Sequence, residues 1–194
     1  LEGNPFLGLR GIRFSLAHPD LFDEQLRAML RAGEGRDLRI LLPMVGSVDE
    51  VRDTRARIDA ALRDLAEEGL PHQAEPRLGA MVELPSAVEC AEDLAAEADF
   101  LSIGSNDLVM YLLAVDRTNE QVEHLYQPYH PAVLRAMARV VDAALRHDCP
   151  VSICGEAGGD PAMIRFLLGC GLRSISADPA RLRRIRTTIS ELSV

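Results

Sequence analysis

The stretch Phe100-Leu-Ser-Ile-Gly-Ser-Asn-Asp-Leu108 decides the fold of this chain. It is an apolar run that ends at a glycine and is followed at once by an amide, Asn106, and a carboxylate, Asp107. The pattern predicts a buried parallel strand that delivers both polar side chains to its carboxyl end. In α/β folds ligands bind at that end, because the loops after the strands converge there.

Two other strand-like runs also end in polar groups. The run that begins at Leu78 stops at Glu83, and the run that begins at Pro150 stops at Cys154. Because the carboxyl ends of parallel strands lie along one edge of a sheet, polar groups at three strand ends predict a single site.

Helical and strand-like segments alternate along the chain. Apolar residues at helical spacing predict helices around 22–31, 48–65, 88–94 and 134–145, and a polar, partly helical connection spans 108–131. Short apolar runs predict strands at 38–44, 78–83, 100–104, 150–154 and 174–177. Ser47 and Glu50 form a capping-box pattern, and Asp-Pro pairs at 160–161 and 178–179 predict two more helix starts. Strands that alternate with helices imply a parallel sheet.

This alternation fits either a doubly wound sheet or a (β/α)8 barrel. Polar residues at the ends of several strands favour the barrel, and no G-x-G-x-x-G motif supports a dinucleotide-binding fold. About five β/α units are three fewer than a barrel needs, and the chain begins at Leu1 instead of a methionine. We therefore expect an α/β fold in which residues 1–194 form the C-terminal part of a TIM barrel whose N-terminal units are missing.

The composition of the chain limits its possible binding partners and its cellular location. The formal net charge of -9 argues against nucleic acid or an anionic membrane surface as a partner. No apolar run approaches the roughly 20 residues that cross a bilayer. The four cysteines show no CxxC pattern, which is typical of reduced thiols. We expect a cytoplasmic protein.

The polar residues at the strand ends have defined chemical capacities. Glu83 and Asp107 offer the oxygen ligands that suit Mg²⁺, although each could instead cap a helix or pair with an arginine. Arg10 and Arg117 could bind phosphate or carboxylate, or could be solvated charges. Cys154 is either an inert buried thiol or, with an ordinary pKa near ~8.5, a protonated general acid at neutral pH.

Six motifs give the chain a family resemblance. The motifs are Asn4-Pro-Phe-Leu-Gly-Leu-Arg-Gly-Ile-Arg13, Met81-Val-Glu-Leu-Pro85, Ser102-Ile-Gly-Ser-Asn-Asp-Leu108, Leu113-Ala-Val-Asp-Arg117, Leu125-Tyr-Gln-Pro128 and Cys154-Gly-Glu156. In order and at similar spacing they resemble the phosphoenolpyruvate (PEP)-binding barrel of the PEP-protein phosphotransferases, known as enzyme I of the bacterial sugar phosphotransferase system. Pyruvate phosphate dikinase and PEP synthase share this barrel and are alternative identities.

The resemblance implies a role for each candidate residue. Arg10 and Arg117 would bind the phosphate of PEP, helped by Asn106 and the backbone at Asp107. Glu83 and Asp107 would hold Mg²⁺.

The resemblance further implies that Cys154 is the acid that protonates the enolate carbon and so makes pyruvate. It also implies a homodimer, and a phosphoryl acceptor that is a histidine on a separate domain, which passes the group to the phosphocarrier protein HPr. Nothing in this sequence resembles that domain, so we expect the fragment alone to be inactive in phosphotransfer. A non-catalytic binding or dimerisation module is the remaining alternative, which the intact motif residues disfavour.

Two positions depart from the family pattern. Ser105 stands where threonine is usual, which keeps the hydroxyl, and Ser176-Ala-Asp-Pro179 diverges after the last predicted strand.

Overall fold

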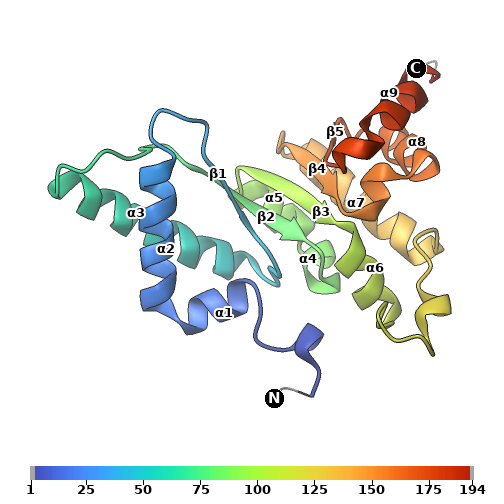
Figure 1. The fold of residues 1–194 in the computed structure, drawn as a ribbon, viewed down its shortest axis with the longest axis horizontal. Coiled ribbons are helices and arrows are strands. Elements are labelled where there is room, and N and C mark those ends of the chain that lie inside the picture. The colour runs from blue at the N-terminus through green and yellow to red at the C-terminus, as the bar shows by residue number, and fades with distance from the viewer. Residues whose placement is uncertain (1–2, 193–194) are drawn as a thin grey trace.

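A computed structural model describes residues 3–192 and shows a sheet of five parallel strands in the order β1-β2-β3-β4-β5 (Figure 1). The two residues at either end of the chain lie outside the described part, so the predicted loop at 1–13 is described from Gly3 onward. The strands are β1 (Arg39–Leu42), β2 (Arg77–Val82), β3 (Phe100–Gly104), β4 (Val151–Cys154) and β5 (Ser174–Ile175).

The strand order follows the sequence without reversal. A doubly wound sheet reverses its order at one point, whereas the wall of a barrel adds each strand beside the previous one. Helices α2 and α3 lie at the β1 end of the sheet, and α8 and α9 lie at the β5 end (Figure 1). The α-helices are α1 (Ile12–Ala17), α2 (Pro19–Ala32), α3 (Val48–Glu67), α4 (Pro85–Glu89), α5 (Ala91–Glu97), α6 (Ser105–Leu113), α7 (Pro131–Arg146), α8 (Pro161–Gly169) and α9 (Leu182–Ser190), and the short 3-10 helices are η1 (Pro5–Leu7), η2 (Glu123–Leu125), η3 (Glu156–Gly159) and η4 (Pro179–Arg181).

The two faces of the sheet differ in burial. Alternate strand residues are buried against the helices and form the core with them. The residues between them point to the opposite face, where several side chains are only half-buried. The buried set is Ile40, Leu42, Leu78, Ala80, Val82, Leu101, Ile103, Val151 and Ile153, and the half-buried set is Leu41, Met81, Ser152 and Cys154.

The predicted helices and strands exist, but the structure differs from the prediction in three places. The helix expected around 88–94 is two short helices that meet at Cys90, whose φ of -97° and ψ of 19° leave the helical region. Helix α6 begins directly after β3, so Asn106 and Asp107 lie in a first helical turn instead of a loop. The last strand has only two residues, because the chain turns at Asp178 into η4.

The predicted helix caps are present. The Asp160 carboxylate accepts hydrogen bonds from the backbone N–H groups of Ala162 and Met163, 2.8 and 3.1 Å away. The Glu50 carboxylate accepts one from the N–H of Ser47 at 3.1 Å, which is the glutamate half of the capping box.

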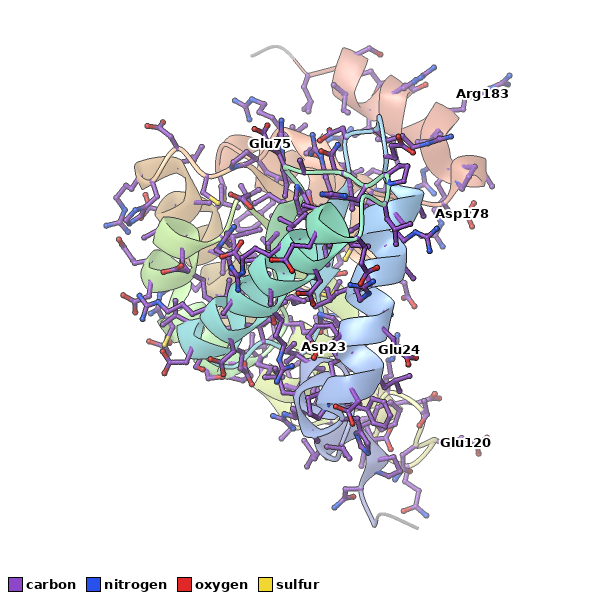
Figure 2. The ribbon with its side chains drawn as sticks, turned by 90° about the vertical axis from the view of Figure 1, so that its left-hand side faces the viewer. Asp23, Glu24, Glu75, Glu120, Asp178 and Arg183 are labelled. Atoms are coloured by element: carbon purple, nitrogen blue, oxygen red, sulfur yellow. The ribbon has the colours of Figure 1, made fainter. Side chains whose placement is uncertain are left out.

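An ion pair joins α2 to α3. Asp23 lies on α2 where that helix faces α3 (Figure 2), and Arg57 of α3 donates hydrogen bonds of 2.9 and 3.0 Å to its two carboxylate oxygens. Within residues 3–192, no helix combines the length and the apolar character needed to span a membrane.

The central strand should dominate stability. Ile103 of β3 is fully buried, so Ile103→Ala removes apolar contacts that neighbouring side chains cannot replace. We expect a loss of roughly 2–5 kcal/mol in the free energy of unfolding, measured by chemical denaturation. The matched control Leu21→Ala, at a position that is 55% exposed on α2, should change it by less than about 1 kcal/mol. Equal losses at both positions would contradict the assigned core.

Candidate functional site

Glu83 follows β2 and is a carboxylate buried at the carboxyl edge of the sheet, with 5% of its surface exposed. Its Oε1 accepts a hydrogen bond from the backbone N–H of Met44, just past β1, at 2.6 Å. Met44 has a φ of 61°, which is uncommon for a residue with a side chain. On the other side, a Cβ at Gly104 would stand 2.7 Å from the Glu83 Oε2, so only glycine leaves room for this carboxylate.

Burial raises the pKa of Glu83, because removal from water disfavours the charged form. The hydrogen bond from Met44 opposes this rise, the negative charge of Asp107 adds to it, and the charge of Arg10 opposes it. These effects place Glu83, Asp107 and Arg10 within electrostatic reach of one another.

Arg10 and Asp107 form an ion pair across 97 positions of sequence. The Arg10 Nη2 donates to the Asp107 Oδ2 at 3.0 Å, and the Asp107 side chain is 11% exposed against 36% for Arg10. The Nη1 of Arg10 donates to the hydroxyl of Tyr111 at 3.2 Å, and the guanidinium carbon lies 5.6 Å from the centre of the Phe6 ring. The alternative in which a candidate carboxylate pairs with an arginine is therefore seen for Asp107.

Asn106 is fixed by contacts with the loop after β4. Its Oδ1 accepts a hydrogen bond from the N–H of Glu156 at 3.0 Å, and its carbonyl accepts one from the Tyr126 hydroxyl at 3.3 Å. Gly155, with a φ of 86°, approaches so closely that an added Cβ would lie 2.9 Å from the Asn106 Oδ1. The amide nitrogen of Asn106 remains as the donor that can face a ligand.

Cys154 ends β4 on the half-buried face of the sheet. Its thiol lies 3.5 Å from the carbonyl oxygen of Ile103, to which it can donate. Burial raises the pKa of the thiol, a hydrogen bond with Ser102 opposes the rise, and the negative charge of Glu83 adds to it. The thiol is therefore protonated at neutral pH.

Arg117 lies beyond α6 and has an unusual environment. Its Nε is buried and has no hydrogen-bond partner among residues 3–192. Its Nη1 is 4.0 Å from the Glu156 Oε1, which is a long contact for an ion pair. A buried donor without a partner is costly and points to a missing acceptor.

The structure thus brings Arg10, Glu83 and Asp107 together, with the Cys154 thiol within reach of the charge of Glu83. Burial raises the pKa of Tyr126, and the charges of Glu156, Arg117 and Asp107 also act on it. Sequence analysis assigned no role to Tyr111. The signal was available, because a residue four positions after Asp107 shares its helix face.

The carboxylates have the chemistry of a metal site but not a complete one. Across residues 3–192, no group of three or more histidine, cysteine, aspartate or glutamate side chains is placed to hold a metal ion. Any metal bound here would take the two carboxylates and draw its other ligands from water or substrate.

The strand order and the alternation of strands with helices define an α/β protein with a parallel sheet. Solved structures agree on the fold. The match to a citrate lyase from Burkholderia xenovorans covers 86% of this chain and 53% of the citrate lyase chain, with a TM-score of 0.62 and 24% sequence identity. A citrate lyase beta subunit from Mycobacterium tuberculosis, complexed with oxaloacetate and magnesium, covers 81% and 63% with a TM-score of 0.55 and 16% identity.

Sequence comparison gives the family. Residues 1–194 match the PEP-binding domain of PEP-utilising enzymes, and the chain belongs to this family. It is 47% identical to a phosphoenolpyruvate-protein phosphotransferase of Cupriavidus necator over 96% of this chain, and 43% identical to that of Bacillus subtilis over 99%. The chain spans about a third of the length of these relatives, 32% and 34% respectively.

The raised pKa of Glu83 predicts a stability that depends on pH. A folded-state pKa above the ordinary value of 4.5 contributes stability below that value, which is lost as the pH rises through the folded-state pKa. Glu83→Gln keeps an acceptor for the Met44 N–H and removes the buried charge. We expect Glu83→Gln to raise the melting temperature at pH 7 but not at pH 4.

The control is Glu24→Gln, on the exposed face of α2 (Figure 2), which should leave the melting temperature unchanged at both values. A lower melting temperature for Glu83→Gln at pH 7 would show that the buried charge stabilises the fold.

The thiol of Cys154 should react slowly. Because its pKa is raised, we expect alkylation by iodoacetamide to stay slow at pH 7 and to accelerate only above pH 9, followed peptide by peptide with mass spectrometry. Glu83→Gln removes a negative charge near the thiol and should speed alkylation at pH 8. Glu89→Gln, at an exposed glutamate of α4, should not. Fast alkylation of Cys154 at pH 7 in the unaltered protein would contradict this protonation state.

Proposed function

We propose that this chain is the PEP-binding part of a phosphoenolpyruvate-protein phosphotransferase. In the longer protein, the phosphoryl group of PEP would pass to a histidine on another domain, and pyruvate would be released. The family match and the shared name of the relatives support this proposal. Because the chain spans about a third of those relatives, we expect it to bind PEP and not to transfer the phosphoryl group alone.

The five β/α units fit the C-terminal part of a (β/α)8 barrel. In such a barrel the half-buried face of the sheet would look inward, and further strands would cover its side chains. The unreversed strand order and the barrel-type neighbours support this placement.

The phosphate and carboxylate of PEP would be held by charge and by backbone donors. Arg10, which pairs with Asp107 of α6, and Arg117, which lies beyond α6, each offer a guanidinium fork. The first N–H groups of this nine-residue helix, at Asn106 and Asp107, have no acceptors within the helix and favour an anion. A ligand oxygen would also give the buried Nε of Arg117 an acceptor, which no residue in the described part of the chain supplies.

Glu83 and Asp107 fit a magnesium ion. One oxygen of each carboxylate is already bound, by the Met44 N–H and by Arg10, which fixes the orientation of both groups. Within the described part of the chain, no donor hydrogen-bonds to their other oxygens, Glu83 Oε2 and Asp107 Oδ1. When bound, Mg²⁺ would neutralise charge on the substrate oxygens during phosphoryl transfer.

Cys154 would supply the proton. Breaking the P–O bond leaves the electron pair on the enolate oxygen of pyruvate. The enolate carbon then takes a proton from the thiol, and a thiolate remains to be reprotonated by solvent. A pKa raised by burial keeps the thiol protonated until that moment.

The partners of the complete enzyme follow from the same proposal. They are PEP and pyruvate, the histidine-bearing domain, the phosphocarrier HPr and a second copy of the chain in a homodimer. We propose a cytoplasmic location, where PEP and HPr are available.

One observation carries the proposal: Arg10, Glu83 and Asp107, from three separate segments, meet at the carboxyl edge of the sheet. Isothermal titration of PEP into the 194-residue chain should show binding that requires Mg²⁺. Asp107→Ala removes a metal ligand and the partner of Arg10, so it should weaken binding at least about tenfold.

The control is Asp142→Ala, which removes an exposed carboxylate of α7 and should leave the affinity unchanged. The proposal is overturned if the unaltered chain does not bind PEP. It is also overturned if the affinity for PEP changes neither on removal of Mg²⁺ nor in Asp107→Ala.

A further inference from the structure

The Tyr111 hydroxyl lies at the centre of a hydrogen-bond network that none of the proposed roles uses. It accepts from the Arg10 Nη1 at 3.2 Å and donates to the backbone carbonyl of Phe6. It also lies 3.8 Å from the Met44 sulfur. We infer that Tyr111 is a positioning residue, which orients Arg10 for the phosphate of PEP, and this inference rests on the proposed function above.

The geometry makes Tyr111 a directional acceptor. A phenol hydroxyl has one proton, and here that proton is donated in a hydrogen bond to the carbonyl oxygen of Phe6. The lone pairs of the oxygen are therefore left to face Arg10. Burial raises the pKa of Tyr111, an effect that the nearby Arg10 charge opposes, so the hydroxyl keeps its proton at neutral pH.

Arg10 is held from one helix at two points. Tyr111 stands four residues after Asp107 on α6, so both side chains lie on the same helix face. Asp107 binds Nη2 and Tyr111 binds Nη1, and because the guanidinium is planar these two contacts fix its plane. The side chain still has 36% of its surface exposed, so its remaining N–H groups can reach a ligand.

This arrangement lowers the cost of binding phosphate. A free arginine side chain loses rotamer entropy when it binds a ligand, whereas Arg10 is already ordered by Tyr111 and Asp107. Through the carbonyl of Phe6 the same hydroxyl also ties the segment around η1 to α6. Tyr111 thus holds both the guanidinium and the backbone that carries it.

A double-mutant cycle tests the inference. PEP and oxalate, a dicarboxylate that resembles enolpyruvate but lacks the phosphate, are titrated with Mg²⁺ into the unaltered chain, Tyr111→Phe, Arg10→Gln and the double variant. Tyr111→Phe keeps the ring and should weaken PEP binding about tenfold, the value of one hydrogen bond to a charged group. It should leave oxalate binding unchanged, and it should add no further loss in the Arg10→Gln background.

The matched control is Tyr129→Phe. Tyr129 is 49% exposed, and the carboxylate that raises the pKa of its hydroxyl is Asp160, which lies outside this network, so removal of the hydroxyl should leave PEP affinity unchanged. Thermal melting of each variant verifies that it is folded.

The outcomes separate the two proposals. If Tyr111→Phe weakens PEP and oxalate equally, or weakens PEP equally with and without Arg10, Tyr111 supports the structure in general and the positioning role is wrong. Unchanged PEP affinity in Tyr111→Phe also overturns that role and leaves the proposed function standing. If the unaltered chain binds oxalate but not PEP, or neither, the proposed function fails, and the positioning role fails with it.

Discussion

A carboxylate buried at the edge of the sheet is the constraint on which the site depends. Removing the Glu83 charge from water is costly. A backbone donor and a neighbouring cation offset part of this cost, and a missing side chain leaves room for the carboxylate. The donor requires the left-handed conformation of Met44, and the missing side chain is that of Gly104. Three consecutive strands therefore end as they do because one carboxylate must fit among them, and this fixes where Asp107 and Arg10 can stand.

Local patterns were sufficient to predict most of the fold. Each predicted strand exists, and the parallel sheet followed from the alternation of strands and helices. The break at Cys90 was not predictable, because the apolar spacing of Val88 and Leu94 continues across it and only tertiary packing separates the two helices. The last strand was predicted too long, because the sequence of residues 174–177 does not reveal where pairing with β4 ends.

For the site, the sequence predicted which residues belong together but not how they interact. Glu83, Asp107 and Cys154 were recognised because each lies at or just after the end of an apolar run. These runs form neighbouring strands, so their ends lie close together in the sheet. The Arg10–Asp107 ion pair depends on side-chain directions, which no spacing encodes. The same holds for the Nε of Arg117, which has no hydrogen-bond partner among residues 3–192. Asp107 was seen as a carboxylate with three possible uses, as a metal ligand, a helix cap or an arginine partner. The structure shows the arginine pairing through Oδ2. Among residues 3–192 no donor bonds its Oδ1, which stays available to a metal ion.

The unreversed strand order has a consequence for how the chain reaches its structure. Every strand pairs only with the strands before and after it in sequence, and the widest gap joins Leu101 to Val151. Short gaps carry a small loop-closure entropy, so each pairing can form without waiting for a distant segment. During synthesis, each strand can acquire its neighbour as soon as the following unit leaves the ribosome. The chain can therefore fold vectorially, and the sheet edge that carries the candidate site assembles in the same order in which its residues are translated.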